Sequence, residues 1–215
     1  MTHRHADYIP AAGHDFLLPL YDPVLRVLFR ERTLRTRFLD LAAIEAGQRV
    51  LDLGCGTATL LLMLKQRCPS ADLVGVDGDA KVLAIARAKA KKQSAAIHFD
   101  EALATQLPYA DASFDRVLCS AMLHHLTRDE KVQALRESRR VLARGGSFHL
   151  VDFGPPQNAF ALRVVRTLHR GKRMADNLDG RLPELMREAG FARVEHGGPL
   201  NTVLGTFIYL SARTA

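Results

Sequence analysis

Two carboxylates and a glycine turn could together hold a small charged ligand. Asp52 precedes the turn Gly54-Cys55-Gly56-Thr57, and Asp77 lies about twenty residues beyond it. Glycines at such a turn let the backbone approach a ligand closely, and a carboxylate at that spacing can accept hydrogen bonds from both ribose hydroxyls. Asp52 would repel a pyrophosphate and instead suits a cationic ligand. The structural alternative is that both carboxylates merely cap the helices that follow them.

Three residues further along the chain could move a proton. His124 and His125 follow the apolar segment 114–119, and Asp152 ends the segment 147–152. Histidine titrates near neutral pH and is the commonest general base in enzymes. His125 is the first candidate and Asp152 the second. The histidine pair could equally cap the next helix or line the wall of the core.

The elements that would position these residues alternate between strand and helix from Arg49 onward. Each short apolar run is followed by a segment with helical periodicity, which predicts parallel strands with helices on both faces. The predicted strands are 50–53, 72–76, 96–99, 114–119, 147–152 after a Gly145-Gly146 turn, 191–195 and 203–210; the predicted helices between them are 58–67, 79–91 and 128–142. The sequence therefore predicts an α/β, doubly wound, mostly parallel sheet of seven strands.

The two ends of the chain differ from this alternating core. Helical patterns at 23–32 and 33–44 predict an N-terminal cap over residues 1–48, ahead of a ligand-binding core at 49–153. Residues 154–215 are expected to form lid helices at 159–170 and 180–189, then an antiparallel hairpin that turns around Gly197-Gly198-Pro199. We expect residues 1–215 to be one domain, because a chain of this length can bury one substantial core.

Composition excludes several classes of protein. The absence of a long apolar run predicts no integral membrane association, and the N-terminus lacks a secretion signal, so we expect a cytoplasmic protein. Three cysteines without paired spacing predict reduced thiols and no metal site. The net charge of +7 is accompanied by a basic run at 163–173. The sequence lacks the long basic stripe with interleaved aromatic residues that is typical of nucleic-acid binders, so nucleic acid is not favoured as a partner.

Four sequence blocks resemble the class I S-adenosylmethionine-dependent methyltransferases, closest to the ubiquinone and menaquinone biosynthesis branch. They are LDLGCGTA (51–58), LVGVDGD (73–79), LPYADASFDRVLCSAMLHHL (107–126) and RRVLARGGSFHLVDF (139–153). The resemblance implies a Rossmann-like fold with S-adenosylmethionine as cofactor and S-adenosylhomocysteine as product. It places Gly54, Cys55, Gly56 and Thr57 around the methionine portion, Asp77 and Gly78 at the ribose and Ser120 beside the cofactor. A tyrosine of the cap, Tyr21, is expected to close over it.

The sequence departs from the family pattern at the adenine site. Such methyltransferases place an aspartate about four residues before the Leu-Pro pair, where this chain has Leu103. Asp100 or Glu101 could replace it only with a longer loop, so the backbone of Ala102 and Leu103, together with apolar stacking, is expected to hold the adenine.

The resemblance predicts in-line methyl transfer to a small-molecule acceptor, in which alignment supplies much of the rate and a base is optional. A phenol, enol or quinol carbon as acceptor would benefit from His125. The alternatives within the class are acceptors such as a phospholipid headgroup or RNA, which the basic run would attract. Outside the class stand an NAD-dependent oxidoreductase, which would need a glycine near Thr59, and a nucleotide-binding protein without catalysis. The sequence leaves the acceptor and the oligomeric state open.

Overall fold

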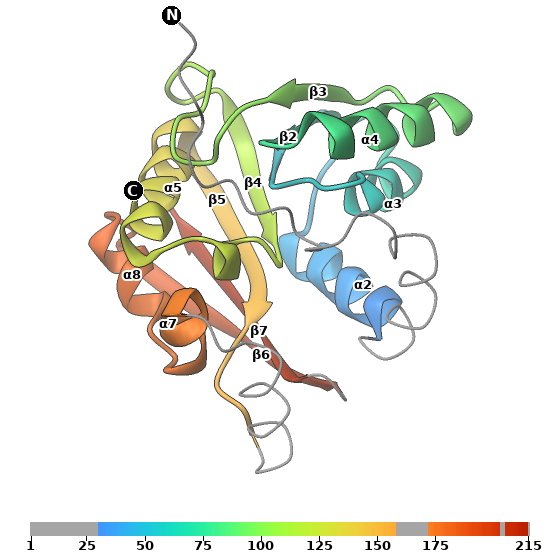
Figure 1. Ribbon diagram of the computed structural model, residues 1–215. Coiled ribbons are helices and arrows are strands. Elements are labelled where there is room, and N and C mark those ends of the chain that lie inside the picture. Colours follow the sequence, from blue (N-terminus) through green and yellow to red (C-terminus); the bar gives the residue numbers. More distant parts are fainter. Residues whose placement is uncertain (1–29, 158–171, 203–204, 215) are drawn as a thin grey trace, which may run out of the picture.

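The computed structural model describes residues 30–157, 172–202 and 205–214, and in these ranges seven strands form one sheet (Figure 1). The strand order is β3-β2-β1-β4-β5-β7-β6; pairs from β3 to β5 are parallel, and β7 is antiparallel to both neighbours. The predicted doubly wound α/β class with an antiparallel terminal pair is confirmed. The strands are β1 (Arg49–Leu53), β2 (Asp72–Asp77), β3 (His98–Glu101), β4 (Phe114–Ser120), β5 (Leu142–Phe153), β6 (Arg193–Thr202) and β7 (Gly205–Arg213).

Helices cover both faces of this sheet. Figure 1 shows α2, α3 and α4 on one side and α5, α7 and α8 on the other. Helices α2, α3 and α4 pack onto one apolar core, and α5 and α8 pack onto a second. The helices are α2 (Glu31–Ala42), α3 (Thr59–Arg67), α4 (Ala80–Lys92), α5 (Arg128–Val141), α7 (Ala175–Leu178) and α8 (Leu182–Glu188), with 3-10 turns η1 (Leu123–His125) and η2 (Lys172–Met174).

The alternation of side chains along β1 places one functional carboxylate. Val50 packs into the core beneath α2, α3 and α4, whereas Leu51 and Leu53 pack into the core beneath α5 and α8. Because successive side chains of a strand point to opposite faces, Asp52 shares the face of Val50. The carboxylate therefore points to the side of the sheet that α2 covers.

The start of β5 differs from the prediction. The strand begins at Leu142, directly after α5, and not after the Gly145-Gly146 pair. Leu142 pairs with Phe114, and the register with β4 then shifts before Ser147 pairs with Arg116. The two glycines therefore form an irregularity within the strand, where a Cβ on Gly146 would lie 2.9 Å from the carbonyl oxygen of Ala143.

The turn of the terminal hairpin was also predicted at the wrong place. β6 continues through Gly197 and Gly198 with a register shift between His196 and Pro199, and its pairing with β7 ends at Thr202 and Gly205. A Cβ on Gly197 would lie 2.8 Å from Leu41 Cδ1 of α2 and 3.0 Å from Tyr209 Cβ. The glycine thus permits a close approach of the cap helix to the sheet, which sequence alone cannot distinguish from a turn.

Several expectations concern residues outside the described ranges. These are Tyr21, the helix at 23–32 and the basic helix at 159–170, so the division into cap, core and lid stays a prediction. Of the predicted second cap helix, α2 is observed two residues earlier than the pattern indicates. Among residues 30–157, 172–202 and 205–214, no helix combines the length and apolar character that crossing a bilayer needs. The cytoplasmic location stays a prediction.

Candidate cofactor and acceptor site

A cavity of about 350 Å³ opens at the carboxyl ends of β1, β2 and β4. This is the edge at which open α/β sheets bind their ligands. It brings together the described candidates of the sequence analysis except His124 and Asp152, and its lining includes Asp52, Gly54, Cys55, Gly56, Thr57, Asp77, Gly78, Ala102, Leu103, Ser120 and His125. Asp152 is not among the lining residues and is fully buried.

The glycine turn after β1 leaves room for a ligand. Gly54 and Gly56 have φ of 70° and 54°, in the left-handed region that favours glycine. The N–H groups of Gly54 and Cys55 both donate to Val76 O of β2, at 2.8 and 3.0 Å, which fixes the turn over the strand ends. A Cβ on Gly54 would lie 2.3 Å from Met122 Cγ, whereas a Cβ on Gly56 would meet no atom of the described residues within 4 Å. The open space over Gly56 fits a bound molecule.

Asp77 ties the end of β2 to this turn. Its carboxylate accepts from Gly56 N at 2.9 Å and from Asp79 N at 3.0 Å. Burial raises the pKa of Asp77, and these backbone donors partly oppose that effect. Helix α4 is capped by Asp79, which accepts from the N–H groups of Lys81 and Val82, so the alternative role of Asp77 as that cap is wrong. A carboxylate held at the cavity wall by main-chain donors is arranged to receive ribose hydroxyls.

Asp52 is a buried carboxylate with an unused acceptor. Its exposure is 2%, and its Oδ1 has no hydrogen-bond partner among the described residues. Burial raises its pKa to about 7, with Asp77 adding to the effect and the Arg35 cation opposing it. It does not cap α3, whose N-cap is Ala58 without a side-chain hydrogen bond. A buried acceptor without a partner in a cavity wall fits a ligand that brings a cationic donor.

Ala102 and Leu103, the residues expected to hold adenine, line the cavity. Ala102 N donates to Asp77 O at 3.2 Å, which joins this loop to Asp77. Asp100 does not replace the missing aspartate: it accepts from Tyr109 Oη at 2.9 Å and pairs with His98 Nε2 at 2.9 Å. The lining is consistent with the expected backbone and apolar contacts.

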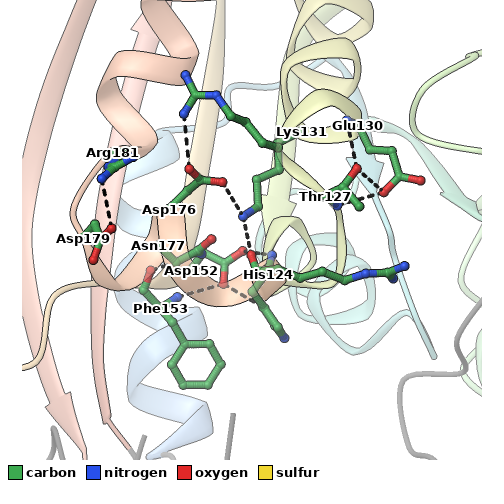
Figure 2. Close-up of polar contacts among 12 residues, drawn as sticks. His124, Thr127, Glu130, Lys131, Asp152, Phe153, Asp176, Asn177, Asp179 and Arg181 are labelled. Carbon is green, nitrogen blue, oxygen red and sulfur yellow. Dashed lines mark hydrogen bonds and ion pairs between the residues drawn. The ribbon is translucent and has the colours of Figure 1, made fainter. Parts of the chain in front are cut away.

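Asp152 serves a different purpose from Asp52 (Figure 2). Its Oδ1 lies 2.7 Å from His124 Nδ1 and accepts from Phe153 N at 2.8 Å, and its Oδ2 accepts from His124 N at 3.2 Å. Burial acts to raise the pKa of Asp152, but the His124 ring and the backbone donors outweigh it and hold the pKa below its ordinary value. With His124 protonated at Nδ1, the pair fixes both the ring and the backbone of η1.

His125 follows on the same 3-10 turn and lines the cavity. Its N–H donates to Met122 O at 3.0 Å, and its carbonyl accepts from Arg173 Nη1 at 2.9 Å. The two histidine rings lie 4.0 Å apart between centroids. The histidine pair does not cap α5, because Thr127 and Glu130 form a complete capping box there.

The buried ion pair of Lys131 and Asp176 lies next to η1 (Figure 2). Lys131 of α5 is fully buried, and its Nζ lies 3.2 Å from Asp176 Oδ2 of α7 and donates to Arg173 O. Burial lowers the pKa of Lys131, and the Asp176 charge opposes that shift. Helix α5 and the η2–α7 segment are thereby joined next to the turn that carries His125.

Arg35 and Met122 are two of the lining residues that the sequence analysis did not identify. Arg35 reaches the cavity from α2, and Met122 packs against Gly54 from the loop after β4. Arg35 lies in the cap. Because the cap is separate from the glycine turn in sequence, no local pattern indicated that the two share a cavity. Met122 stands inside the resembling block 107–126 and could have been identified from its position beside the histidine pair.

Comparisons with known proteins agree with this geometry. Residues 50–146 match a family model described as a methyltransferase domain. The chain is 42% identical over 149 residues to a demethylmenaquinone methyltransferase of Thermus thermophilus, with 68% of this chain and 67% of the relative aligned. It is 36% identical over 152 residues to a protein of the same name from Deinococcus radiodurans, with 70% and 62% aligned. The chain thus spans less than two thirds of that second relative.

A solved structure named as a SAM-dependent methyltransferase from Aquifex aeolicus has the same fold, with a TM-score of 0.67 at 16% identity over 91% of this chain and 95% of that one. Family membership removes the NAD-dependent alternative, in keeping with Thr59 where that class needs glycine. The open space over Gly56 and the unpartnered Oδ1 of Asp52 fit a cofactor with a cationic amino acid end. The chain belongs to the class I methyltransferases, enzymes that take their methyl group from S-adenosylmethionine.

Proposed function

We propose that the protein methylates a ring carbon of a small hydroxylated aromatic acceptor of the hydroquinone class. The names of the relatives from Thermus thermophilus and Deinococcus radiodurans support this class of acceptor. The chemistry of the cavity supports it independently, because an aromatic ring needs an apolar wall and its hydroxyl needs a base.

The observation that carries the proposal is the position of His125. It lines the same cavity as the glycine turn, next to the apolar side chains of Ala121, Met122 and Leu126. An imidazole among apolar neighbours, at the end of the cavity formed by β4, can face a hydroxyl group on a flat apolar molecule. An amine or thiolate acceptor would not need a base there.

In this reaction His125 accepts the hydroxyl proton of the acceptor, which concentrates electron density on the neighbouring ring carbon. When bound, S-adenosylmethionine supplies a methyl group on a positively charged sulfur. The ring carbon gains the methyl group and then loses its own hydrogen as a proton, so the aromatic ring is restored. The His124–Asp152 pair holds the turn that aims His125, and Asp152 acts as a positioning residue without contact with the acceptor.

Transfer of labelled methyl groups tests the proposal. The assay presents the full chain with S-adenosylmethionine and, separately, a short-tailed demethylnaphthohydroquinone, a benzohydroquinone, phosphoethanolamine, phospholipid vesicles and RNA. We expect incorporation into a hydroquinone ring carbon, located by mass spectrometry and NMR. His125→Ala should lower kcat by about 100- to 10,000-fold, the range for a general base, with S-adenosylhomocysteine affinity retained.

His196→Ala is the matched control, because His196 is exposed on β6 and away from the cavity. Exclusive labelling of phosphoethanolamine, vesicles or RNA would establish the corresponding alternative acceptor. A loss below about tenfold in His125→Ala would remove the base role. Cofactor binding without turnover on any of these acceptors would favour a binding protein without catalysis.

A further inference from the structure

Arg35 is the cationic residue of α2 that reaches the cofactor cavity. It lies one helical turn from the buried residues Phe38 and Leu39, so it is on the face of α2 that packs on the sheet. Its guanidinium pairs with Glu31 on the same helix. Its side chain is 23% exposed, which leaves it between solvent and the cavity.

The position of α2 is fixed by contacts far along the chain. Tyr209 Oη of β7 donates to Leu34 O at 3.2 Å, and Arg37 Nη1 donates to Pro199 O at 3.0 Å. Arg67 of α3 pairs with Asp40 at 2.8 Å. Because β6, β7 and α3 all hold the helix, the base of the Arg35 side chain has a defined place beside the cavity.

Opposite charges therefore meet in one cavity without neutralising each other directly. The Arg35 cation acts on Asp52, whose pKa it lowers against the larger effect of burial. Oδ1 of Asp52 has no hydrogen-bond partner among residues 30–157, 172–202 and 205–214, so Arg35 does not donate to that oxygen. The other carboxylate of the wall, Asp77, already accepts from backbone N–H groups. A wall that carries a cation and a carboxylate with an unused acceptor matches a zwitterion such as an amino acid group.

We infer that Arg35 binds the carboxylate of the methionine portion of the cofactor while Asp52 accepts from its ammonium group. This inference rests on the cofactor of the family and not on the proposed acceptor. A guanidinium suits a carboxylate because its donors form a planar fork. In this arrangement Glu31 holds Arg35 when no ligand is bound, and the ligand carboxylate takes the place of Glu31.

Three ligands that lose the two charges one at a time test the assignment. S-adenosylhomocysteine carries both groups, decarboxylated S-adenosylmethionine carries only the ammonium, and 5′-methylthioadenosine carries neither. In calorimetric titrations Arg35→Gln should weaken S-adenosylhomocysteine about 10- to 100-fold, the fold-change expected for a lost charged hydrogen bond. It should leave 5′-methylthioadenosine unchanged and should not weaken the decarboxylated ligand. Asp52→Asn should weaken the first two ligands and spare the third.

Arg32→Gln is the matched control: it removes the same charge from the same helix at an exposed residue outside the cavity lining. Circular dichroism of each variant checks that α2 remains folded. Equal weakening of all three ligands by Arg35→Gln would mean that Arg35 only holds the cap, and no weakening of any would mean that it makes no contact; either result overturns the inference. Failure to methylate a hydroquinone leaves these titrations unaffected, so the two proposals fail separately.

Discussion

Two buried aspartates, at the ends of β1 and β5, illustrate opposite uses of the same side chain. Asp52 is 2% exposed, one of its oxygens has no partner in the part of the chain that the structure describes, and burial raises its pKa to about 7. Asp152 is fully buried, accepts from two backbone N–H groups and pairs with a histidine ring, and its pKa lies below the ordinary value. Burial is nearly the same for both, so the number of donors provided by the fold accounts for the difference.

The source of the donors explains the contrast. β5 ends at Phe153, whose N–H donates to the Asp152 carboxylate, and His124 of η1 donates its own N–H to the same carboxylate. β1 is followed by the glycine turn, whose N–H groups donate to Val76 O and to the Asp77 carboxylate and not to Asp52. A satisfied buried carboxylate therefore belongs to the scaffold that holds a site, whereas an unsatisfied one in a cavity wall belongs to the site itself.

The largest expected effect comes from removing the satisfied carboxylate. Asp152→Ala should lower the free energy of unfolding by about 3 to 5 kcal/mol, because it leaves buried donors without their charged partner. Urea denaturation at neutral pH measures this. A change under about 1 kcal/mol would show that Asp152 does not stabilise the fold and would end the contrast with Asp52.

The second effect concerns the pH dependence of stability at Asp52. The folded pKa is raised to about 7, so the contribution of this group to stability is fully present below about pH 4 and is lost as the pH rises through 7. The free energy of unfolding of Asp52→Asn minus that of the parent should therefore increase by about 2 to 3 kcal/mol as the pH rises from 5 to 8, since one pKa unit corresponds to 1.36 kcal/mol. Thermal or urea unfolding of both proteins at the two pH values provides the comparison. A constant difference would mean that Asp52 titrates normally.

Asp77 is intermediate, because both of its oxygens are engaged by the backbone while its side chain lines the cavity. Asp77→Ala should weaken S-adenosylhomocysteine binding by about 1.5 to 3 kcal/mol, the range for a lost hydrogen bond to a charged group. Calorimetry measures the affinity, and Asp72→Ala at the exposed start of the same strand is the control. Unchanged affinity would contradict the ribose assignment and leave Asp77 only as the support of the turn.

The smallest effect comes from removing one hydrogen-bond donor of Asp152, which brings its surroundings closer to those of Asp52. His124→Phe keeps an aromatic ring against Phe153, whose centroid lies 5.1 Å away, but removes the ring donor. The remaining backbone donors should limit the loss of stability to about 1 to 2 kcal/mol. His196→Phe, at an exposed site, should change stability little. A loss as large as that of Asp152→Ala would assign the whole stabilisation to the ring.

The residues that sequence located correctly lie close together along the chain. A buried strand, a glycine turn and a helix form one local unit, so the placement of Asp52 and Gly56 could be read directly from the pattern. Arg35 could not, because its place depends on how α2 packs against β6 and β7, more than 150 residues away in the sequence. The turn predicted at Gly197 was wrong for the same reason. The missing side chain of Gly197 permits the contact with Leu41, and the local sequence does not indicate that contact.

The role of Asp152 also required the structure. Its place at the end of a strand is equally compatible with a side chain open to the ligand and with one covered by the next turn. Only the position of η1, with His124 over the carboxylate, decides between them.

Arg140 and Glu137 tie the segment between β3 and β4 to α5, with a consequence for ligand recognition. Arg140 donates to the carbonyls of Leu107 and Tyr109 and pairs with Asp111 and Glu137, and Glu137 in turn accepts from Leu107 N at 2.8 Å. The loop that ends at this anchor begins with Ala102 and Leu103. Its conformational entropy is therefore lost when the protein folds and not when a ligand arrives, so a ligand that contacts Ala102 and Leu103 meets a preorganised wall, and its affinity is not reduced by the ordering of a loop.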